Sequence, residues 1–363
     1  MAPAFSSPKQ AGAFALLLLG ILLLPVLVGK SLLPPRERVY SSAPWTAGAY
    51  PYLQEQIFQE KGDIDIAFIG ASAEYLAIDT PEVQRQLCAK LGRKAVVRSL
   101  CWYWAGFDSI YFITEDLLRN RKVHLLIFTD ATGENSPHPQ AYRWFRFGDN
   151  QRDLTGLSPQ TMAAFYAEAV LGTPNNLLEF FEPEQPAIPF SYEQLSSNGS
   201  LYAENPAQRL GSLAAEKGFD DQHPFVEFKP HSEANPSDVC FYSPATKERF
   251  LSINLAMPEI QLRFVQKLAD LAAKNGTKLA FLSLPIFELA RSPSVVIPRV
   301  WPEVLQSDVA MLGISPGKLF QNISDDDLRK LFFDDVHLNK NGQRYFTSIF
   351  APALVDYYAQ SKP

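Results

Sequence analysis

The chain is poor in cysteine and has no excess of basic residues. Its 363 residues include three cysteines, Cys88, Cys101 and Cys240. Three are too few for a disulfide framework, and an odd number leaves at least one thiol unpaired. Lysine and arginine number 33 against 39 aspartates and glutamates, which gives a formal net charge of -6. With no basic footprint, the charge balance argues against nucleic acid as a partner.

The composition is otherwise that of an ordinary folded protein. Hydrophobic residues make up 47% of the chain and charged residues 20%, which is typical of globular domains. The length is sufficient for one large domain with insertions or for two smaller domains. Overall composition does not show whether a chain is attached to a membrane, so membrane association is judged from local runs of apolar residues.

One long uncharged run lies near the N-terminus. Residues 11–28 (AGAFALLLLGILLLPVLV) contain no charge and are bracketed by Lys9 and Lys30. A run of this length can cross the hydrocarbon core of a bilayer as a helix. A secretory signal peptide is the alternative, but its apolar core is usually shorter and ends at a small-x-small cleavage site, which VLVGKS matches poorly. We expect residues 1–31 to form an uncleaved single-pass anchor.

The charges that flank this run favour one orientation. Lys30, Arg36 and Arg38 follow it, whereas Lys9 and the amino terminus precede it. Because basic residues are enriched on the cytoplasmic side, this count favours a cytoplasmic C-terminal part.

Beyond a linker at residues 32–55, strand and helix patterns alternate. The apolar runs are nearly continuous, as in strands that are buried on both faces, so the sequence predicts the α/β class. We expect a three-layer α/β/α sandwich with a parallel, flavodoxin-like sheet. Strands are expected at 63–70, 95–100, 122–129 and 278–284, and helices at 81–91, 107–120, 255–273 and 341–358.

The alternation stops between about residues 133 and 250. Two aromatic helical pieces, at 160–171 and 176–181, lie among prolines, asparagines and serines. The segment is too long for a simple connection and too apolar to be wholly disordered. We expect it to form a mostly helical or irregular cap, inserted into a domain that spans residues 56–363.

Residues with catalytic potential lie at the two ends of this domain. Asp334 stands three residues before His337, in a loop that runs into the last helix. Such a carboxylate can orient an imidazole that acts as general base, and Asp335 is the alternative acid. Ser72 follows the first strand, at the edge where open α/β sheets bind ligands. A lone serine there is best explained as a helix cap, but the combination predicts a Ser-His-Asp set.

The two blocks resemble those of the SGNH (GDSL-like) hydrolase superfamily. The nucleophilic serine of that family follows the first strand in a Gly-Asp-Ser block, and Gly70-Ala71-Ser72 stands there with alanine in place of aspartate. The acid and base of the family lie in a C-terminal Asp-x-x-His block, which residues 334–337 match. The resemblance covers residues 63–129 and 255–358. It implies that Ser72 is the nucleophile, His337 the base and Asp334 the acid.

Further site residues are expected in the loops after the second and third strands. The resemblance makes Gly106 the counterpart of an oxyanion-hole glycine. Asp130 (in TDATG) stands where the family has a Gly-x-Asn-Asp block, which is not recognisable here. Trp102, in a run of three aromatic residues, suits a sugar ring, although local packing is the alternative. His138 and Arg143 could bind an anionic or acyl donor group, or could simply belong to a surface loop.

Two further clusters of ionisable residues have simpler explanations. Glu74, two residues past the serine, is expected to be a first-turn helix acid that favours the helix dipole. The spacings of His223, His231 and Cys240 match no zinc pattern. We expect no metal and no cofactor.

The departures from the family blocks, together with the apolar N-terminal run, resemble a divergent membrane-anchored envelope branch. That branch includes DltD-like proteins and acetyltransferase-like proteins of exopolysaccharide machineries. The resemblance implies a periplasmic or otherwise extracytoplasmic domain, and we prefer it to the count of flanking charges. It also implies a cell-envelope polysaccharide or an acyl donor as substrate. The implied protein partner is a membrane-bound O-acyltransferase or a polysaccharide synthesis complex.

We therefore expect a serine esterase or O-acyltransferase that acts on acyl esters, chiefly acetyl esters, of a cell-envelope or extracellular polysaccharide. Two alternatives remain open. A non-catalytic member of the same superfamily would bind polymer or serve as a scaffold in an envelope assembly complex. A lipid-directed esterase would use the same three residues on a substrate in its own membrane.

Overall fold

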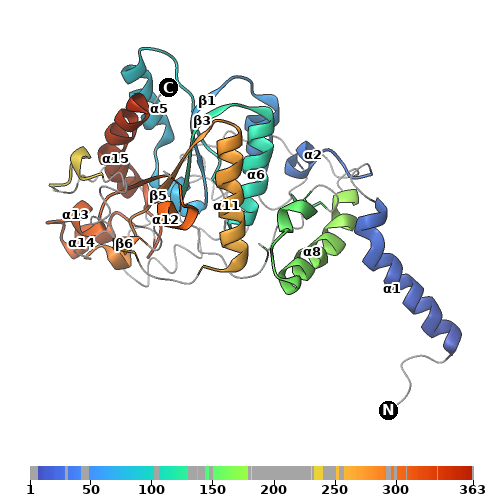
Figure 1. The fold of residues 1–363 in the computed structure, drawn as a ribbon. Helices are drawn as coiled ribbons and strands as arrows, with labels where there is room; N and C mark the ends of the chain where they lie inside the picture. The colour runs from blue at the N-terminus through green and yellow to red at the C-terminus, as the bar shows by residue number, and fades with distance from the viewer. Residues whose placement is uncertain are drawn as a thin grey trace.

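The computed structural model shows an α/β body with one long helix projecting from it (Figure 1). The described residues are 7–28, 32–41, 49–101, 106–129, 137, 144–146, 150–178, 181, 230, 233–239, 251–252, 257–291, 296–297, 301–307, 309–332 and 334–361.

The body is organised around a five-stranded sheet in which every neighbouring pair of strands is parallel. The strand order is β2-β1-β3-β5-β7. Counted along the chain this is the order 2-1-3-4-5, which is the flavodoxin-like arrangement. The predicted parallel α/β sandwich is confirmed. The strands are β1 (Ile64–Ile69), β2 (Val97–Ser99), β3 (Val123–Thr129), β5 (Lys278–Ser283) and β7 (Ala310–Gly313).

Helices cover both faces of the sheet, which explains the continuous apolar runs of the strands. All six residues of β1 are buried. Phe128 and Phe281 belong to the apolar cluster on one face, and Phe68 and Leu312 to the cluster on the other. In Figure 1, α6 and α11 lie side by side against the first face, and α5 and α15 lie against the second. These helices are α5 (Thr80–Leu91), α6 (Phe107–Asn120), α11 (Glu259–Lys274) and α15 (Lys340–Gln360).

Several elements differ from the sequence-based expectation. β7 was not predicted, because four residues flanked by irregular chain are too short to show a period. The two-stranded sheet of β4 (Leu251–Ser252) and β6 (Val296–Ile297) was missed for the same reason. The two helical pieces expected at 160–171 and 176–181 form a single helix, α8 (Pro159–Leu178). Most of the expected cap, including 182–229, lies outside the described residues.

The remaining short elements lie mainly near the last strand. They are α4 (Ser72–Ala77), α12 (Trp301–Leu305), α13 (Pro316–Leu319), α14 (Asp325–Arg329), and 3-10 turns at Gln151–Leu154, Pro236–Asp238 and Phe287–Leu289. Trp301 of α12 is fully buried, and its ring stacks on that of Phe281 with the centroids 4.6 Å apart. Offset aromatic stacking of this kind adds to the stability that burial provides.

The N-terminal helix α1 (Pro8–Val28) begins three residues before the expected start at residue 11. Proline is well tolerated in the first turn of a helix, because its missing N–H would have no helical partner there. Within the described residues, α1 is the helix long and apolar enough to cross a membrane or to act as a signal sequence.

The segment expected to be a linker, 32–55, is instead folded onto the body over most of its described length. It contains α2 (Arg36–Ser41) and α3 (Ala49–Gln54), and a π-helical turn (Glu55–Gln59) follows directly. Val39 and Tyr40 of α2 are buried in the same apolar cluster as Phe112 of α6. Burial of these side chains explains why the chain after α1 does not behave as a free tether.

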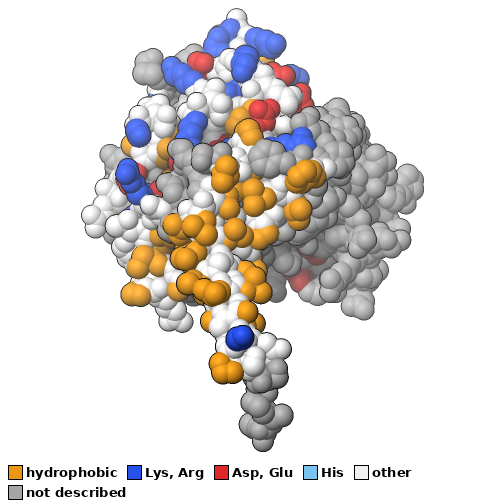
Figure 2. Space-filling model, turned by 90° about the vertical axis from the view of Figure 1, so that its right-hand side faces the viewer, with side chains coloured by type: hydrophobic (Ala, Val, Ile, Leu, Met, Phe, Trp, Pro, Cys, Tyr) orange, Lys and Arg blue, Asp and Glu red, His pale blue; other side chains and the backbone are white. Residues whose placement is uncertain are grey.

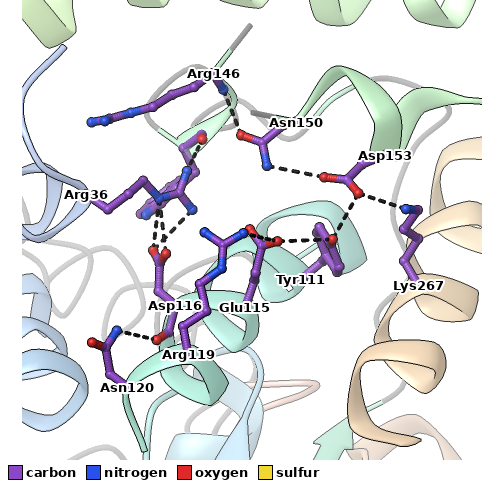
Figure 3. Close-up of polar contacts among 11 residues, drawn as sticks. Arg36, Tyr111, Glu115, Asp116, Arg119, Asn120, Arg146, Asn150, Asp153 and Lys267 are labelled. Atoms are coloured by element: carbon purple, nitrogen blue, oxygen red, sulfur yellow. Dashed lines mark hydrogen bonds and ion pairs between the residues drawn. The ribbon is translucent and has the colours of Figure 1, made fainter. Parts of the chain in front are cut away.

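A buried ion pair attaches α2 to α6 (Figure 3). The Arg36 guanidinium donates to the Asp116 carboxylate with an Nε–Oδ1 distance of 3.1 Å, and it also donates to the Trp144 carbonyl. The Tyr40 hydroxyl donates to the same carboxylate at 2.8 Å. The Asp116 side chain is 2% exposed and that of Arg36 15%. Two polar side chains of α2 therefore neutralise and satisfy one buried carboxylate.

A second carboxylate extends this polar layer to α11. Asp153 accepts hydrogen bonds from the Tyr111 hydroxyl at 3.0 Å and from the Lys267 ammonium at 2.8 Å. Asn150 donates to the other oxygen of Asp153 at 3.2 Å. The chain between Trp144 and α8 is thus fastened to both helices on this face of the sheet, as Figure 3 shows.

We predict that Arg36→Ala lowers the free energy of unfolding by about 3–5 kcal/mol, because it leaves the buried Asp116 carboxylate without its counter-ion. Urea or thermal unfolding of the full chain in detergent measures the loss. Arg85→Ala is the matched control, since Arg85 is exposed and pairs with Glu82 at the surface. Adding Asp116→Ala to Arg36→Ala should restore part of the stability. Equal stabilities of the Arg36 and Arg85 variants would contradict the prediction.

Candidate active site

Ser72 lies at the carboxyl end of the first strand. β1 ends at Ile69, and α4 begins at Ser72 after a turn of two residues. Ala71 is the N-cap residue, with φ -95° and ψ 179°, so Ser72 is the first helical residue rather than the cap. The first N–H groups of a helix have no partner within it. The turn therefore presents a hydroxyl and backbone donors at one edge of the sheet.

His337 and Asp334 lie in a short closed loop before α15. An antiparallel bridge between Phe332 and Leu338 closes the loop. Inside it, Asp334 Oδ1 accepts hydrogen bonds from the backbone N–H of Val336 at 2.9 Å and of His337 at 2.8 Å. These two bonds fix the backbone that carries the imidazole, and they also fix the direction of the Asp334 carboxylate.

The fold brings Ser72, His337 and Asp334 together. Ser72 Oγ lies 2.9 Å from His337 Nε2, although the two residues are 265 positions apart in the chain. On the other side of the ring, His337 Nδ1 lies 2.8 Å from Asp334 Oδ2 and 3.0 Å from Oδ1. The imidazole thus bridges the hydroxyl and the carboxylate, which is the arrangement that a general base requires.

The environment keeps Asp334 ionised. Burial by itself would raise the pKa of the carboxyl group, because the side chain is only 14% exposed. The hydrogen bond and charge of His337, together with the two backbone donors, outweigh burial and lower the pKa below its ordinary value. An ionised carboxylate on Nδ1 holds the proton there and leaves Nε2 free to accept one.

The two adjacent aspartates have different surroundings. The imidazole bonds to Asp334, whereas the backbone carbonyl of Asp335 accepts a hydrogen bond from the N–H of Phe287 at 2.9 Å. This bond ties the loop to the chain that follows β5. The geometry therefore selects Asp334, and not Asp335, as the residue placed to orient the imidazole.

Two polar side chains of α15 connect the histidine loop to the serine helix. Gln343 Nε2 donates to the carbonyls of Tyr75 at 3.4 Å and of Ile78 at 3.2 Å, and Thr347 Oγ1 accepts from the N–H of Asp79 at 3.0 Å. Gln343 and Thr347 are both buried. Neither residue can be assigned a role from the sequence, since one glutamine and one threonine in an amphipathic helix carry no signal.

Asn339 and Gly342 shape the start of α15. The Asn339 side chain caps the helix by accepting from the N–H groups of Asn341 at 2.9 Å and Gly342 at 3.1 Å, and it donates to the Lys330 carbonyl at 2.8 Å. A Cβ atom on Gly342 would lie 2.1 Å from the carbonyl oxygen of Leu331. Only glycine allows the helix to approach the loop this closely.

Gly106 occupies the N-cap position of α6, after β2. β2 is the neighbour of β1 in the sheet, so the chain that follows each strand leaves from the same edge. A Cβ atom on Gly106 would lie 2.6 Å from Asp108 Oδ1 and 3.3 Å from Gln261 Nε2, which explains the glycine by packing.

The other predicted site residues, Trp102, Asp130, His138 and Arg143, lie outside the described residues, as do His223, His231 and Cys240. Within the part of the chain that the structure describes, no group of three or more His, Cys, Asp or Glu side chains could hold a metal ion.

Glu74 lies buried behind the serine turn and was not expected there. Its Oε2 atom is so close to Gly70 that a Cβ on that glycine would lie 2.0 Å away. Burial raises the pKa of Glu74 to about 8, against the opposing effect of hydrogen bonds with Cys101 and Thr129. The side chain is therefore mostly protonated at neutral pH, and it does not act as the charged first-turn acid that the sequence suggested. It packs the ends of β1, β2 and β3 against one another.

We predict that Glu74→Gln changes how stability depends on pH. Between the ordinary pKa of a glutamate and a pKa of about 8 in the folded state, the unfolded chain loses a proton that the folded chain keeps. Stability therefore falls as pH rises through this window and levels off above it. The glutamine side chain has no proton to lose in this window. The stability of the variant relative to the parent should therefore increase with pH up to about 8.

Thermal unfolding of the full chain in detergent, followed from about pH 5 to about pH 9, measures this difference. Glu82→Gln is the control, because the pKa of Glu82 is lowered by its hydrogen bond with Arg85. The Glu82 carboxyl group is therefore largely ionised across this range in both states. Parallel curves for the parent and Glu74→Gln would show that Glu74 is ionised in the folded protein.

No family model matches the chain, and no curated protein matches it. Membership of the SGNH superfamily accordingly stays a prediction from two short blocks of sequence. The function is therefore inferred from the arrangement of Ser72, His337 and Asp334.

Proposed function

We propose that this protein is a serine esterase or O-acyltransferase. The observation that supports it is the unbroken line of hydrogen bonds from Ser72 Oγ through the His337 ring to Asp334, with distances of 2.9 Å and 2.8 Å. The alternative of a serine that merely caps a helix does not account for this line. Ala71 holds the N-cap position, and the Ser72 hydroxyl is directed at the imidazole.

In the first half of the reaction, Ser72 Oγ attacks the carbonyl carbon of an ester while its proton moves to His337 Nε2. Asp334 stabilises the resulting imidazolium and keeps the ring oriented. The tetrahedral intermediate then collapses. The bond to the leaving alcohol breaks, His337 returns the proton to that alcohol, and the acyl group remains on Ser72.

In the second half, the acceptor replaces the leaving alcohol. His337 removes a proton from water or from a hydroxyl group as that oxygen attacks the acyl-enzyme, and Ser72 recovers its proton when it is released. Water as acceptor makes the protein an esterase, and a sugar hydroxyl makes it an O-acyltransferase. The N–H groups of Ser72 and Gly106 are the donors that we assign to the developing oxyanion.

We propose a polysaccharide of the cell envelope as the substrate class, with acetyl as the acyl group. This part of the proposal is supported by the resemblance to the membrane-anchored envelope branch and by α1, which is long and apolar enough to serve as an anchor. Under this proposal, the α/β body lies outside the cytoplasm. Release of acetate from acetylated glycans, compared with cleavage of long-chain esters, separates this substrate class from a lipid.

We predict that a fluorophosphonate labels the parent protein covalently and that Ser72→Ala abolishes the labelling. A phosphonate reacts with an activated serine, and only a hydroxyl next to a base has the required nucleophilicity at neutral pH. Mass mapping of the labelled peptide locates the modified residue. Ser348→Ala is the control, because Ser348 is exposed and its hydroxyl donates to the Tyr345 carbonyl at 2.7 Å. No labelling of the parent would support the non-catalytic alternative.

We predict that Asp334→Asn lowers the rate of labelling by about 10⁴-fold, because an amide cannot hold the imidazole in the tautomer that accepts the serine proton. Asp335→Asn should leave the rate close to that of the parent, since the imidazole bonds to Asp334. The rates come from the time course of fluorophosphonate incorporation. A larger loss with Asp335→Asn than with Asp334→Asn would reverse the assignment of the acid.

A further inference from the structure

The outward face of α8 is apolar where a helix in contact with water would be polar. Its inward face is formed by buried residues such as Phe165 and Ala169. Leu171 is 63% exposed and Leu178 56%, and Phe181 just beyond the helix is 84% exposed. A helix of a soluble protein normally carries charged or polar residues opposite its buried stripe. Among the side chains of α8 that the structure describes, the exposed ones are Pro159, Gln160, Met162, Ala163, Ala167, Leu171, Pro174 and Leu178, and Gln160 in the first turn is the one polar member of this set.

α8 also carries very little charge. Among the 20 residues of the helix, Glu168 is the one side chain that ionises as an acid or base at neutral pH. It is partly buried, and its pKa is raised by burial and by the neighbouring negative charge of Asp108. The outer face therefore presents no charge to its surroundings. Moving such a face out of water therefore costs little desolvation free energy.

α8 packs directly against the membrane-spanning candidate. The hydroxyl of Tyr166 donates to the backbone carbonyl of Leu22, and Pro25 is buried although the rest of α1 is largely exposed. Figure 1 shows α8 next to the C-terminal half of α1. Figure 2 looks onto this side of the molecule, and the hydrophobic side chains along α1 continue onto the adjoining surface of the body.

The level of this contact along α1 limits where α8 can lie. α1 has 21 residues, so it is about 30 Å long and matches the thickness of a hydrocarbon core. Leu22 precedes the last residue, Val28, by six positions, which is a depth of about 9 Å along the axis. An interfacial helix buries its apolar face about 5–10 Å into the boundary between headgroups and acyl chains. The two depths agree.

We propose that α8 is a second membrane-contacting element, which lies in the interface of the bilayer that α1 spans and inserts Leu171, Leu178 and Phe181 among the lipids. The occupant of its outer face is lipid, because that face continues the lipid-facing surface of α1. Tyr166, with its hydroxyl on the α1 backbone, occupies the interfacial level where tyrosine is enriched. This inference goes beyond the proposed chemistry and requires only that α1 is retained in the membrane.

The two membrane contacts have a consequence for the orientation of the whole protein. α1 alone would allow the body to rotate and tilt about one point. α8 supplies a second contact, and the Arg36–Asp116 ion pair fastens the chain after α1 to α6. The body is thereby held in one orientation, with a constant height of Ser72 above the bilayer. Only substrates that reach that height meet the site.

The test uses the full chain reconstituted in vesicles of phosphatidylethanolamine and phosphatidylglycerol. Leu171→Cys and Leu178→Cys are labelled with bimane. Lipids that carry a doxyl quencher are added, with the quencher near the headgroup for residues 171 and 178 and near the end of the acyl chain for residue 18, which lies at the middle of α1. Leu18→Cys in α1 is the positive control. Arg85→Cys is the negative control, because Arg85 is exposed on α5, at the far end of the body from α1 (Figure 1). The parent labelled in parallel gives the background from native cysteines, and thermal unfolding shows that each variant is folded.

We expect bimane at residues 171 and 178 to lose fluorescence to the lipid quencher as it does at residue 18, and bimane at residue 85 to remain unquenched. If only residue 18 is quenched, the anchor stands and the interfacial position of α8 is overturned. If residues 171 and 178 escape the quencher and cross-link between chains, a second copy covers the face, which also overturns the proposal. If residue 18 is not quenched either, α1 itself does not lie in the bilayer, and the proposal fails with it.

Discussion

The contact between α15 and α4 is the constraint on which the site depends. Ser72 and His337 are 265 positions apart, and a hydrogen bond of 2.9 Å between them requires that both backbones be fixed. Gln343 and Thr347 do this by bonding to the backbone of residues 75–79, while Asn339 and Gly342 hold the loop in front of α15. Because these bonds are buried or partly buried, losing one would leave a polar group unsatisfied, which costs more than the bond itself contributes.

The parallel sheet provides the second level of order. All strands of a parallel sheet end at one edge, so the chain after β1 and the chain after β2 leave the sheet together. The Glu74 side chain fills the space between the ends of β1, β2 and β3 with a protonated carboxyl group. Gly70 is the residue that admits it, because any side chain there would collide with the Glu74 carboxyl. The nucleophile turn is thus supported from behind by a neutral acid rather than by an apolar side chain.

Buried charge is also neutralised on the side of the body that carries α1. Asp116 is buried, and Arg36 and Tyr40 of the segment after α1 satisfy it. Residues 36–41 are therefore part of the folded body. Because α8 packs between α1 and the body, the helix that we propose to lie in the bilayer interface and the helix proposed as anchor form one surface (Figures 1 and 2).

The sequence by itself determined the elements whose signal is local. Strands β1, β3 and β5 and helices α1, α6 and α15 follow from apolar runs and helical periodicity, and Asp334 and His337 were identified as a pair because they lie three residues apart. The family resemblance predicted that Ser72 would join this pair with Asp334 as the acid, but the contact itself, with Ser72 2.9 Å from His337, comes from the tertiary structure. The tertiary structure alone decided that Glu74 is buried and that the expected linker is docked through Arg36. β7 belongs with these, since four residues become a strand only by pairing with β5. The physical reason is the same in each case: burial and hydrogen bonding depend on partners far away in the chain, and no local pattern records which partners will meet.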